Sequence, residues 1–394
     1  MALRYEDMRL DCELYNGYKP CAHGNRCLGC THYRPHEKSR GVADFPAPTD
    51  LSLLPAAPKI LIIKTGAMGD VLRTTALLFP IARRFPEAHI TWITDPVSMP
   101  LLASNPYIQR LLPFNDEGIA QAEAARYELI INLEKERAPL ELAARTEAAI
   151  KTGFAPTDAG AVTVFNREAI EALMLGLDDD FKFYLNRKSY PHVVCEAAGF
   201  LFERDPYILM RDAETTKYAQ EFSGRIPAGN LVVGLNSGCG AVFRTKQWST
   251  AGWIGLAQAL AAEANTTVVV MGGKAERDLN AEILAACPEC VDAGTDNALP
   301  AFFGIVDNCD IVVSSDTLGM HIAIALEKHV VALFGSTSHV EIDLYGRGEK
   351  VLTTYPCSPC YRRTCDIQPM CMDAMRWQEV AAAVGRQIEN CRVI

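Results

Sequence analysis

The sequence has 394 residues, of which 49% are hydrophobic and 22% charged, so it is long enough for two soluble domains with sizeable cores. Its net charge of −10 argues against a general nucleic-acid binder, because such proteins are usually basic. Charged residues interrupt the stretch from Arg4 to Glu13, which argues against an apolar signal-peptide core there. No apolar run approaches the ~18 residues of a membrane helix, so we predict a cytoplasmic protein.

The first 45 residues differ in composition from the rest of the chain. They are rich in cysteine, tyrosine, glycine and charge, and they show no clear hydrophobic period. The prolines of Phe45–Pro58 then mark a linker or an extended connector. We therefore predict a separate Cys-rich segment at residues 1–45, which is too polar to fold on core burial alone.

An alternation of strands and helices starts at Lys59. Short buried strands are predicted at 59–64, 89–94 and 128–133, and residues at helical spacing follow the first strand. Pro80 lies inside that helix and should kink or shorten it. This βαβ order predicts a parallel sheet with helices on its faces, in a first domain at 46–220.

The same pattern restarts at Asn230. Strands are predicted at the start of Asn230–Gly240, within Thr266–Gly273, at the start of Cys309–Leu326, and within His329–Gly335. The sequence therefore predicts two Rossmann-like halves with a boundary between Asp212 and Pro227. The second domain is expected at 221–355, and a Cys-containing tail with a helix at 356–394.

Glycine-rich loops follow several of these strands. None matches G-x-G-x-x-G or G-x-x-x-x-G-K-[ST], which disfavours a nicotinamide dehydrogenase and a P-loop NTPase. Three loops of the second half, at 236–240, 272–276 and 314–320, follow strands whose carboxyl ends share one edge of the sheet. Glycine allows close approach to an anion, and helix N-termini attract phosphate, so the loops suit a nucleotide diphosphate.

Several of these stretches together resemble the heptosyltransferase-like glycosyltransferases, family 9. The similar stretches are "ILIIKTGAMGDVLRTTALLFPIARRFPEAHITWIT", "SNPYIQRLLPF", "RTKQW", "VVVMGGKAERDL", "CDIVVSSDTLGMHIAIAL" and "VVALFGSTS". The resemblance covers roughly Lys59 to Met372. It implies an α/β GT-B fold, in which two Rossmann-like domains, for acceptor and donor, face across a cleft, and an inverting transfer that needs no catalytic metal.

The implied activity moves a sugar, most plausibly heptose from an ADP-heptose-type donor, onto a hydroxyl. The acceptor is a lipopolysaccharide-core sugar or a protein side chain. Two alternatives stay open, a nucleotide-sugar epimerase of the same fold and a non-catalytic, metal-stapled carbohydrate-binding or assembly protein. No nucleic-acid partner is expected, while a peripheral place at the inner membrane and a homo-oligomer stay open.

On the acceptor side, the resemblance assigns Asp70 as the general base. A sugar hydroxyl is a poor nucleophile until a carboxylate removes its proton. The alternative is that Asp70 only caps the following helix. Gly66 and Gly69 would let the loop approach the acceptor or the sugar.

On the donor side, Lys246 matches the family's cation beside the donor phosphates, and Asp316 is expected to hold donor-sugar hydroxyls. Arg244 is a second cation; surface cations are the alternative for both basic residues, and Trp248 is predicted to be core. Further donor-binding candidates are Asn236, Ser237, Gly272, Gly273, Glu276, Thr317, Leu318, Gly319 and His321. Of these, 317–319 would offer backbone N–H groups to the diphosphate, Glu276 would accept from ribose hydroxyls or be a surface helix-start residue, and His321 is a ligand or a packed residue.

The chain has fourteen cysteines, and eight of them form two groups. The first group is Cys12, Cys21, Cys27 and Cys30, and the second is Cys357, Cys360, Cys365 and Cys371. In a reducing compartment such clusters point to metal, and four thiolates suit structural zinc or iron, including an iron–sulfur cluster. His23 is a substitute ligand. The resemblance also implies iron at the second group, because a branch of protein-modifying heptosyltransferases binds iron with a similar run.

Overall fold

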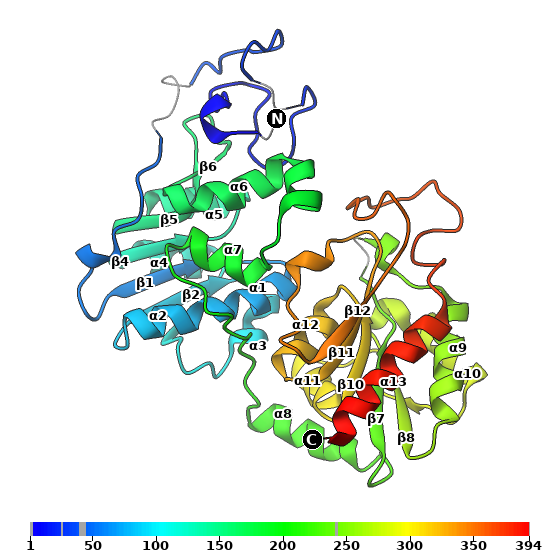
Figure 1. Ribbon diagram of the computed structural model, residues 1–394. Coiled ribbons are helices and arrows are strands. Elements are labelled where there is room, and N and C mark those ends of the chain that lie inside the picture. Colours follow the sequence, from blue (N-terminus) through cyan, green and yellow to red (C-terminus); the bar gives the residue numbers. More distant parts are fainter. Residues whose placement is uncertain (1–2, 25–26, 39–44, 241–242, 394) are drawn as a thin grey trace. The chain divides into compact units, whose positions relative to one another are not determined.

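A computed structural model describes residues 3–24, 27–38, 45–240 and 243–393 (Figure 1). Residue 393 is described by its backbone alone. The chain divides into two compact units, Met1–Ile208 and Leu209–Ile394. This division precedes the expected boundary because helix α8 (Ala213–Ser223) packs on helix α11 (Leu299–Asp307) of the second unit. Gly304 of α11 meets the α8 backbone so closely that a Cβ there would lie 2.7 Å from the nitrogen of Ala219.

The first unit is built on a sheet which, in the described residues, has six strands in the order β3-β2-β1-β4-β5-β6. The strands are β1 (Lys59–Ile63), β2 (His89–Thr94), β3 (Arg110–Pro113), β4 (Tyr127–Asn132), β5 (Ala148–Pro156) and β6 (Val162–Val164). All pairs are parallel except β5 with β6. This is the strand order of a Rossmann sheet. Successive strands are added on one side of β1 up to β3 and then on its other side from β4, so the order reverses between β1 and β4.

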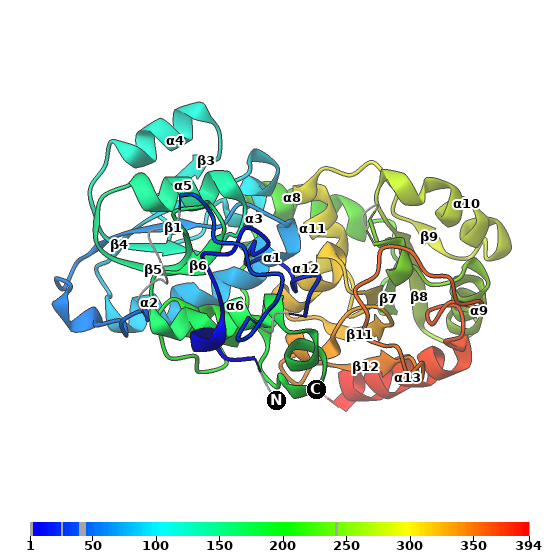
Figure 2. The same cartoon turned by 90° about the horizontal axis from the view of Figure 1, so that it is seen from above.

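Helices cover both faces of that sheet, as Figure 2 shows. They are α1 (Met68–Thr74), α2 (Leu78–Arg84), α3 (Met99–Leu102), α4 (Asp116–Glu123), α5 (Arg137–Arg145), α6 (Ile170–Leu177) and α7 (Tyr190–Ala197). One core joins α1, α2 and α7 to β1, β2 and β4, and another joins α4 and α5 to the opposite face. Strands β1, β2 and β4 are therefore buried on both faces, as their near-continuous apolar sequences predict.

Pro80 shortens the first helix as expected. The α-helical hydrogen bonding of α1 ends at Thr74, a 3₁₀ turn covers Thr75–Leu77, and α2 then begins at Leu78. Pro80 has no N–H to donate to the preceding turn, so it occupies the first turn of a new helix.

The second unit repeats the design with the strand order β12-β11-β10-β7-β8-β9, again counted in the described residues and parallel throughout. The strands are β7 (Leu231–Asn236), β8 (Thr266–Met271), β9 (Val291–Asp292), β10 (Ile311–Ser315), β11 (His329–Phe334) and β12 (Gly348–Leu352). The helices, besides α8 and α11, are α9 (Thr250–Ala261), α10 (Arg277–Ala286), α12 (Leu318–Ala325) and α13 (Trp377–Val393). Its reversal point lies between β7 and β10.

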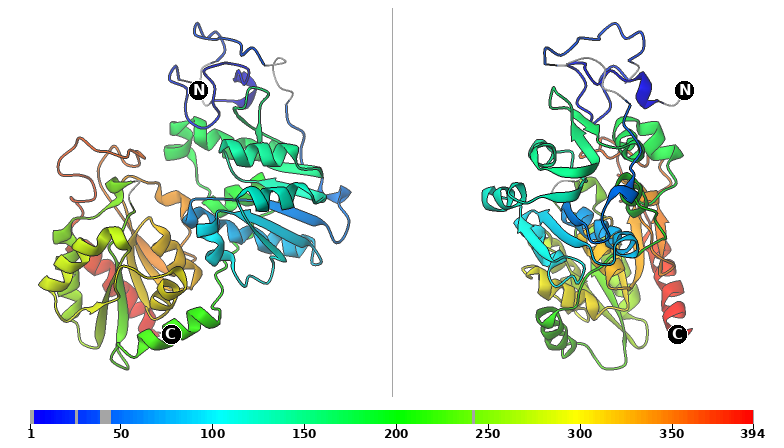
Figure 3. Two further views of the ribbon diagram at one scale, coloured as in Figure 1. Left: turned by 180° about the vertical axis from the view of Figure 1, so that it is seen from behind. Right: turned by 90° about the vertical axis from the view of Figure 1, so that its left-hand side faces the viewer.

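One core of this unit lies between the sheet and helices α9, α10 and α13. Trp248 belongs to it, with 1% of its surface exposed and its indole N–H donated to the carbonyl of Met375. The prediction that Trp248 is core is therefore confirmed. Helix α13 packs along this face (Figure 3). In the sequence, the second cysteine group lies between α13 and β12.

The Cys-rich N-terminal segment belongs to the first unit. Tyr5, Met8, Leu10 and Tyr15 are buried in a core that β6 and α6 share. The expectation that this segment lacks core burial is thus wrong for residues 5–15. Among the described residues, no helix combines the length and the apolar character needed to cross a membrane.

Candidate functional site

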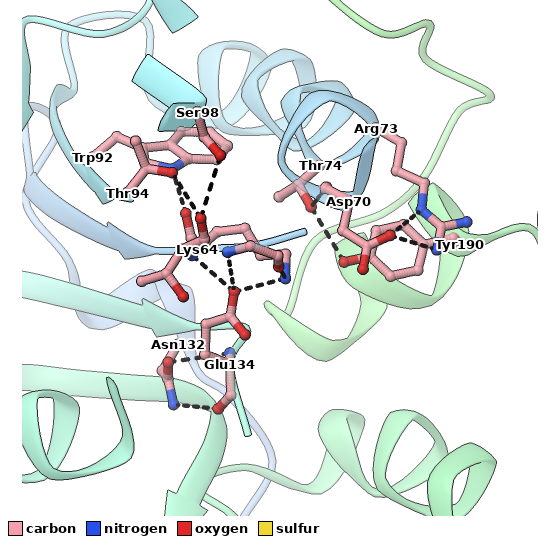
Figure 4. Close-up of polar contacts among 12 residues, drawn as sticks. Lys64, Asp70, Arg73, Thr74, Trp92, Thr94, Ser98, Asn132, Glu134 and Tyr190 are labelled. Carbon is pink, nitrogen blue, oxygen red and sulfur yellow. Dashed lines mark hydrogen bonds and ion pairs between the residues drawn. The ribbon is translucent and has the colours of Figure 1, made fainter. Parts of the chain in front are cut away.

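In the first unit, the candidate site lies where β1 and β4 end, at the reversal point of the sheet. The loop from Lys64 leads into α1, whose first turn carries Asp70. An Asp70 carboxylate oxygen lies 2.8 Å from an Arg73 guanidinium nitrogen, and the two side chains are 36% and 11% exposed (Figure 4). The cap position of α1 is Ala67, so Asp70 does not serve as the N-cap residue. Asp70 is a partly exposed carboxylate, and the ion pair with Arg73 stabilises its negative charge.

Arg73 is itself fixed from a distant part of the chain. Its guanidinium lies over the ring of Tyr190, 3.7 Å from the centroid, and Tyr190 begins helix α7. The Tyr190 hydroxyl also lies 3.4 Å from that of Thr74. Sequence reasoning missed both Arg73 and Tyr190. The i,i+3 spacing of Asp70 and Arg73 is a usable signal, whereas nothing local indicates Tyr190.

A buried ion pair holds the loop that follows β1. Lys64 and Glu134 lie 2.7 Å apart with side chains only 4% and 10% exposed. The same Glu134 oxygen accepts from the backbone N–H groups of Thr65 at 2.7 Å and Gly66 at 3.1 Å, and Lys64 also donates to the carbonyl of Gly66. Burial alone would lower the pKa of Lys64, but Tyr190, Glu134 and Asp70 outweigh it and raise that pKa. Glu134, at the end of β4, therefore sets the course of the loop after β1.

Replacing Glu134 by glutamine should lower the free energy of unfolding by about 3 kcal/mol, because it leaves the buried Lys64 ammonium without its counter-charge. Glu136→Gln is the matched control, two residues away and exposed, and should change stability by less than about 0.5 kcal/mol. Urea titration followed by circular dichroism measures both variants. Equal stability of the two would show that the pair does not hold the loop.

In the second unit, three of the predicted residues come together. The Lys246 ammonium donates to the backbone carbonyl of Asp316 at 2.8 Å and lies 3.4 Å from its carboxylate. The Nε2 of His321 lies 3.7 Å from the other carboxylate oxygen. Lys246 and Asp316 are each 18% exposed at the side chain, so the interpretation of Lys246 as a solvated surface cation is wrong.

The loop after β10 is tied to the end of β7. The Asn236 amide donates to the hydroxyls of Ser314 at 2.8 Å and Thr317 at 3.0 Å. Thr317 precedes α12, so the N–H groups of Leu318 and Gly319 lie in its first turn, where a helix leaves N–H groups without intrahelical partners. A Cβ on Gly319 would lie 2.6 Å from the Asn236 side chain. The network thus presents the start of α12 at the reversal point of the sheet.

Glu276 is buried, with 7% of its surface exposed, so the alternative of a surface residue is wrong. Its carboxylate accepts from the backbone N–H of Gly273 at 3.0 Å. Beside it, the Ser237 hydroxyl donates to the Asn280 side-chain carbonyl, and both groups are close to Gly272. Arg244, by contrast, is exposed at the start of the Arg244–Lys246 turn.

The second cysteine group packs against the turn that carries Lys246. The Thr245 hydroxyl donates to the carbonyl of Arg362, and the N–H groups of Cys360 and Tyr361 donate to the carbonyl of Ser336. The half-buried Tyr361 donates to Glu341 at 2.8 Å, and burial, with Glu341 second, raises its pKa. Sequence reasoning missed Tyr361, because its neighbours in space are far away in the chain.

Both reversal points therefore carry polar groups that suit group transfer. The first unit offers a half-open carboxylate, which can accept a proton from a hydroxyl. The second offers a cation and a helix N-terminus, which can stabilise the charge of a departing diphosphate.

A family model for glycosyltransferase family 9 (heptosyltransferase) matches residues 121–371, more than half of the chain. The chain belongs to this family. Lipopolysaccharide heptosyltransferase 1 of Pseudomonas aeruginosa is 25% identical to this glycosyltransferase over 332 residues, which cover 79% of the chain and 88% of the relative.

Solved structures of the same fold agree. The glycosyl transferase family 9 protein of Veillonella parvula has a TM-score of 0.68 at 17% identity, covering 84% of this chain and 98% of its own. The ADP-heptose LPS heptosyltransferase II of Escherichia coli has a TM-score of 0.64 at 18% identity, with 85% and 99% covered. The iron-containing dodecameric glycosyltransferase TibC of enterotoxigenic E. coli gives 0.54 at 13% identity, with 86% and 78% covered. The predicted α/β fold of two Rossmann-like domains, of the GT-B class, is confirmed.

Proposed function

We propose that this glycosyltransferase moves a heptose from an ADP-heptose-type donor to a hydroxyl of a lipopolysaccharide-core sugar, with inversion and without a metal ion in the reaction. The Lys246–Asp316 pair beside the first turn of α12 is the observation that carries the proposal. The relatives named as lipopolysaccharide heptosyltransferases support the acceptor and the sugar. A protein hydroxyl is the second acceptor class. The second cysteine group supports this alternative, because it is similar to the cysteine run of the protein-modifying heptosyltransferases.

The chemistry is a single displacement. Asp70 takes the proton of the acceptor hydroxyl while that oxygen bonds to the anomeric carbon. The bond from this carbon to the diphosphate oxygen breaks, and ADP leaves with the electron pair. Attack and departure on opposite sides invert the configuration at that carbon.

On the donor side, Lys246 and the N–H groups of Leu318 and Gly319 stabilise the charge that grows on the diphosphate. Asp316 holds sugar hydroxyls rather than phosphate, because two negative groups would repel each other. The buried carboxylate of Glu276 lies at the loop expected to receive the ribose. Asn236 and Ser237 support these loops through the hydrogen bonds that they already make.

The proposal is tested by incubating the purified protein with ADP-heptose and either lipopolysaccharide-core acceptors or peptides bearing serine and threonine. Mass spectrometry should show one added heptose on the core acceptor, and NMR of the product should show the inverted anomer. Brief addition of EDTA, too short to extract a thiolate-bound structural ion, should leave the rate unchanged. Conversion of the donor alone into an isomer would instead identify an epimerase, and heptose on the peptide alone would overturn the lipopolysaccharide assignment.

We also propose that the second cysteine group holds a structural zinc or iron ion. Cys371 is buried, and burial followed by Cys360, Cys357 and Cys365 raises its pKa, so these three thiols lie within electrostatic range of it. Four thiols suit either metal. When bound, the ion would fix this loop, which in turn contacts Thr245 beside Lys246.

A further inference from the structure

The N-terminal segment contains a small cavity that the proposed reaction does not use. Its walls include Cys12, Cys21, Cys27, Cys30, His23 and His32. The space open to the centre of a water-sized particle is about 20 Å³, and a single such particle needs about 10–15 Å³. The cavity therefore has room for an ion.

The backbone presents three of these thiols from tight turns. The N–H of Cys30 donates to the carbonyl of Cys27 at 3.1 Å, and the N–H of Gly24 donates to that of Cys21 at 2.8 Å. Gly29 and Gly24 have φ values of 73° and 82°, a region that favours glycine. Each turn folds the chain back at a cysteine, and the C-x2-C turn places two thiols on one short loop.

The four thiols share one cavity, because the side chains of Cys12, Cys21, Cys27 and Cys30 all line it. Thiolates in such proximity repel one another unless a cation offsets their charge. The rings of His23 and His32 are stacked beside them, with centroids 3.9 Å apart.

We propose that this cavity binds one metal ion of the zinc class through Cys12, Cys21, Cys27 and Cys30. In the described residues no group of three or more candidate side chains is already arranged to hold a metal, so the proposed site requires the thiols to draw together around the ion. Zinc is a borderline-soft cation, and four thiolates are one of the usual donor sets of structural zinc. His23 and His32 are adjacent and would flank the ion.

The site has a structural consequence for the neighbouring loop at Tyr18. The Tyr15 hydroxyl donates to the carbonyl of Val162, and the Val162 N–H donates to the carbonyl of Asn16, so this stretch is fixed on β6. Burial and then Glu136, Glu134 and Asp70 raise the pKa of Tyr18, which places its phenol within electrostatic range of the candidate acceptor loop. An ion at Cys21, three residues later, holds this stretch from its other end.

The test is the metal content of the full-length protein, purified from zinc-supplemented medium with reductant and without chelator. Cys27→Ser should contain one zinc ion less per chain than the wild type, whereas Cys391→Ser should contain the same amount. Cys391 is the matched control, because it is also half-buried and lies outside both groups. Cys27→His should restore the ion, since histidine replaces cysteine in many zinc sites. This result does not depend on whether Asp70 is the base.

A second measurement covers the case in which Cys27→Ser folds poorly. Wild-type protein treated with a chelator should lose amide protection in residues 12–38 first, and zinc alone should restore it. Equal zinc in the wild type and Cys27→Ser, or disulfides among the four cysteines in reduced cytoplasmic extracts, would overturn the proposal.

Discussion

Replacing Asp70 by asparagine should reduce kcat by about 10²–10⁴-fold, the range typical of losing a general base. Asparagine keeps the size of the side chain and a hydrogen-bond acceptor for Arg73, so the local structure should survive. Donor affinity should stay nearly unchanged, because the predicted donor-binding residues lie in the second unit and Asp70 lies in the first. Steady-state kinetics with a core acceptor and calorimetric titration of ADP measure the two effects separately.

The control for this experiment is Asp116→Asn. Asp116 is also an aspartate in the first turn of a helix, but it is exposed on α4 and away from the loop after β1. Both variants lose one carboxylate from a helix start, so any shared loss reflects the helix dipole. Wild-type turnover of Asp70→Asn would contradict its assignment as the base.

Replacing Lys246 by alanine should reduce kcat by about 10²–10³-fold, comparable to removing one preorganised group that stabilises developing charge. It should also weaken ADP binding, because the diphosphate is already charged in the ground state. The loss has a second cause, since the Asp316 carboxylate would lose the ammonium that lies 3.4 Å away. Calorimetric titration with ADP measures the binding affinity. Quenched transfer assays at saturating donor measure kcat.

Lys217→Ala serves as its control. Lys217 is an exposed lysine on α8 whose nearest acid, Glu221, is 3.9 Å away. Its replacement should leave both ADP affinity and turnover within experimental error. If Lys246→Ala behaves in the same way at every donor concentration, the cation beside the diphosphate must be sought elsewhere.

The sequence by itself determined the kinds and the order of the main elements. The buried strands at 59–63, 231–236 and 311–315 are short apolar runs bounded by glycine turns, and such runs are readable because their signal is local. Because parallel strands end at one edge of the sheet, strand order also predicted that the loops at 236–240, 272–276 and 314–320 converge. The structure joins the first and last of these loops through the hydrogen bond from Asn236 to Thr317.

Only the tertiary structure decided which groups support the two loops. Glu134 reaches Thr65, Tyr190 lies against Arg73, and the carbonyl of Arg362 accepts from Thr245. These partners are separated by many residues, and no period or spacing links them. Their proximity follows from how helices and loops pack on the sheet, which depends on the whole chain. Local patterns and the family resemblance therefore indicated the groups of the proposed chemistry, while long-range packing selected the groups that hold them in place.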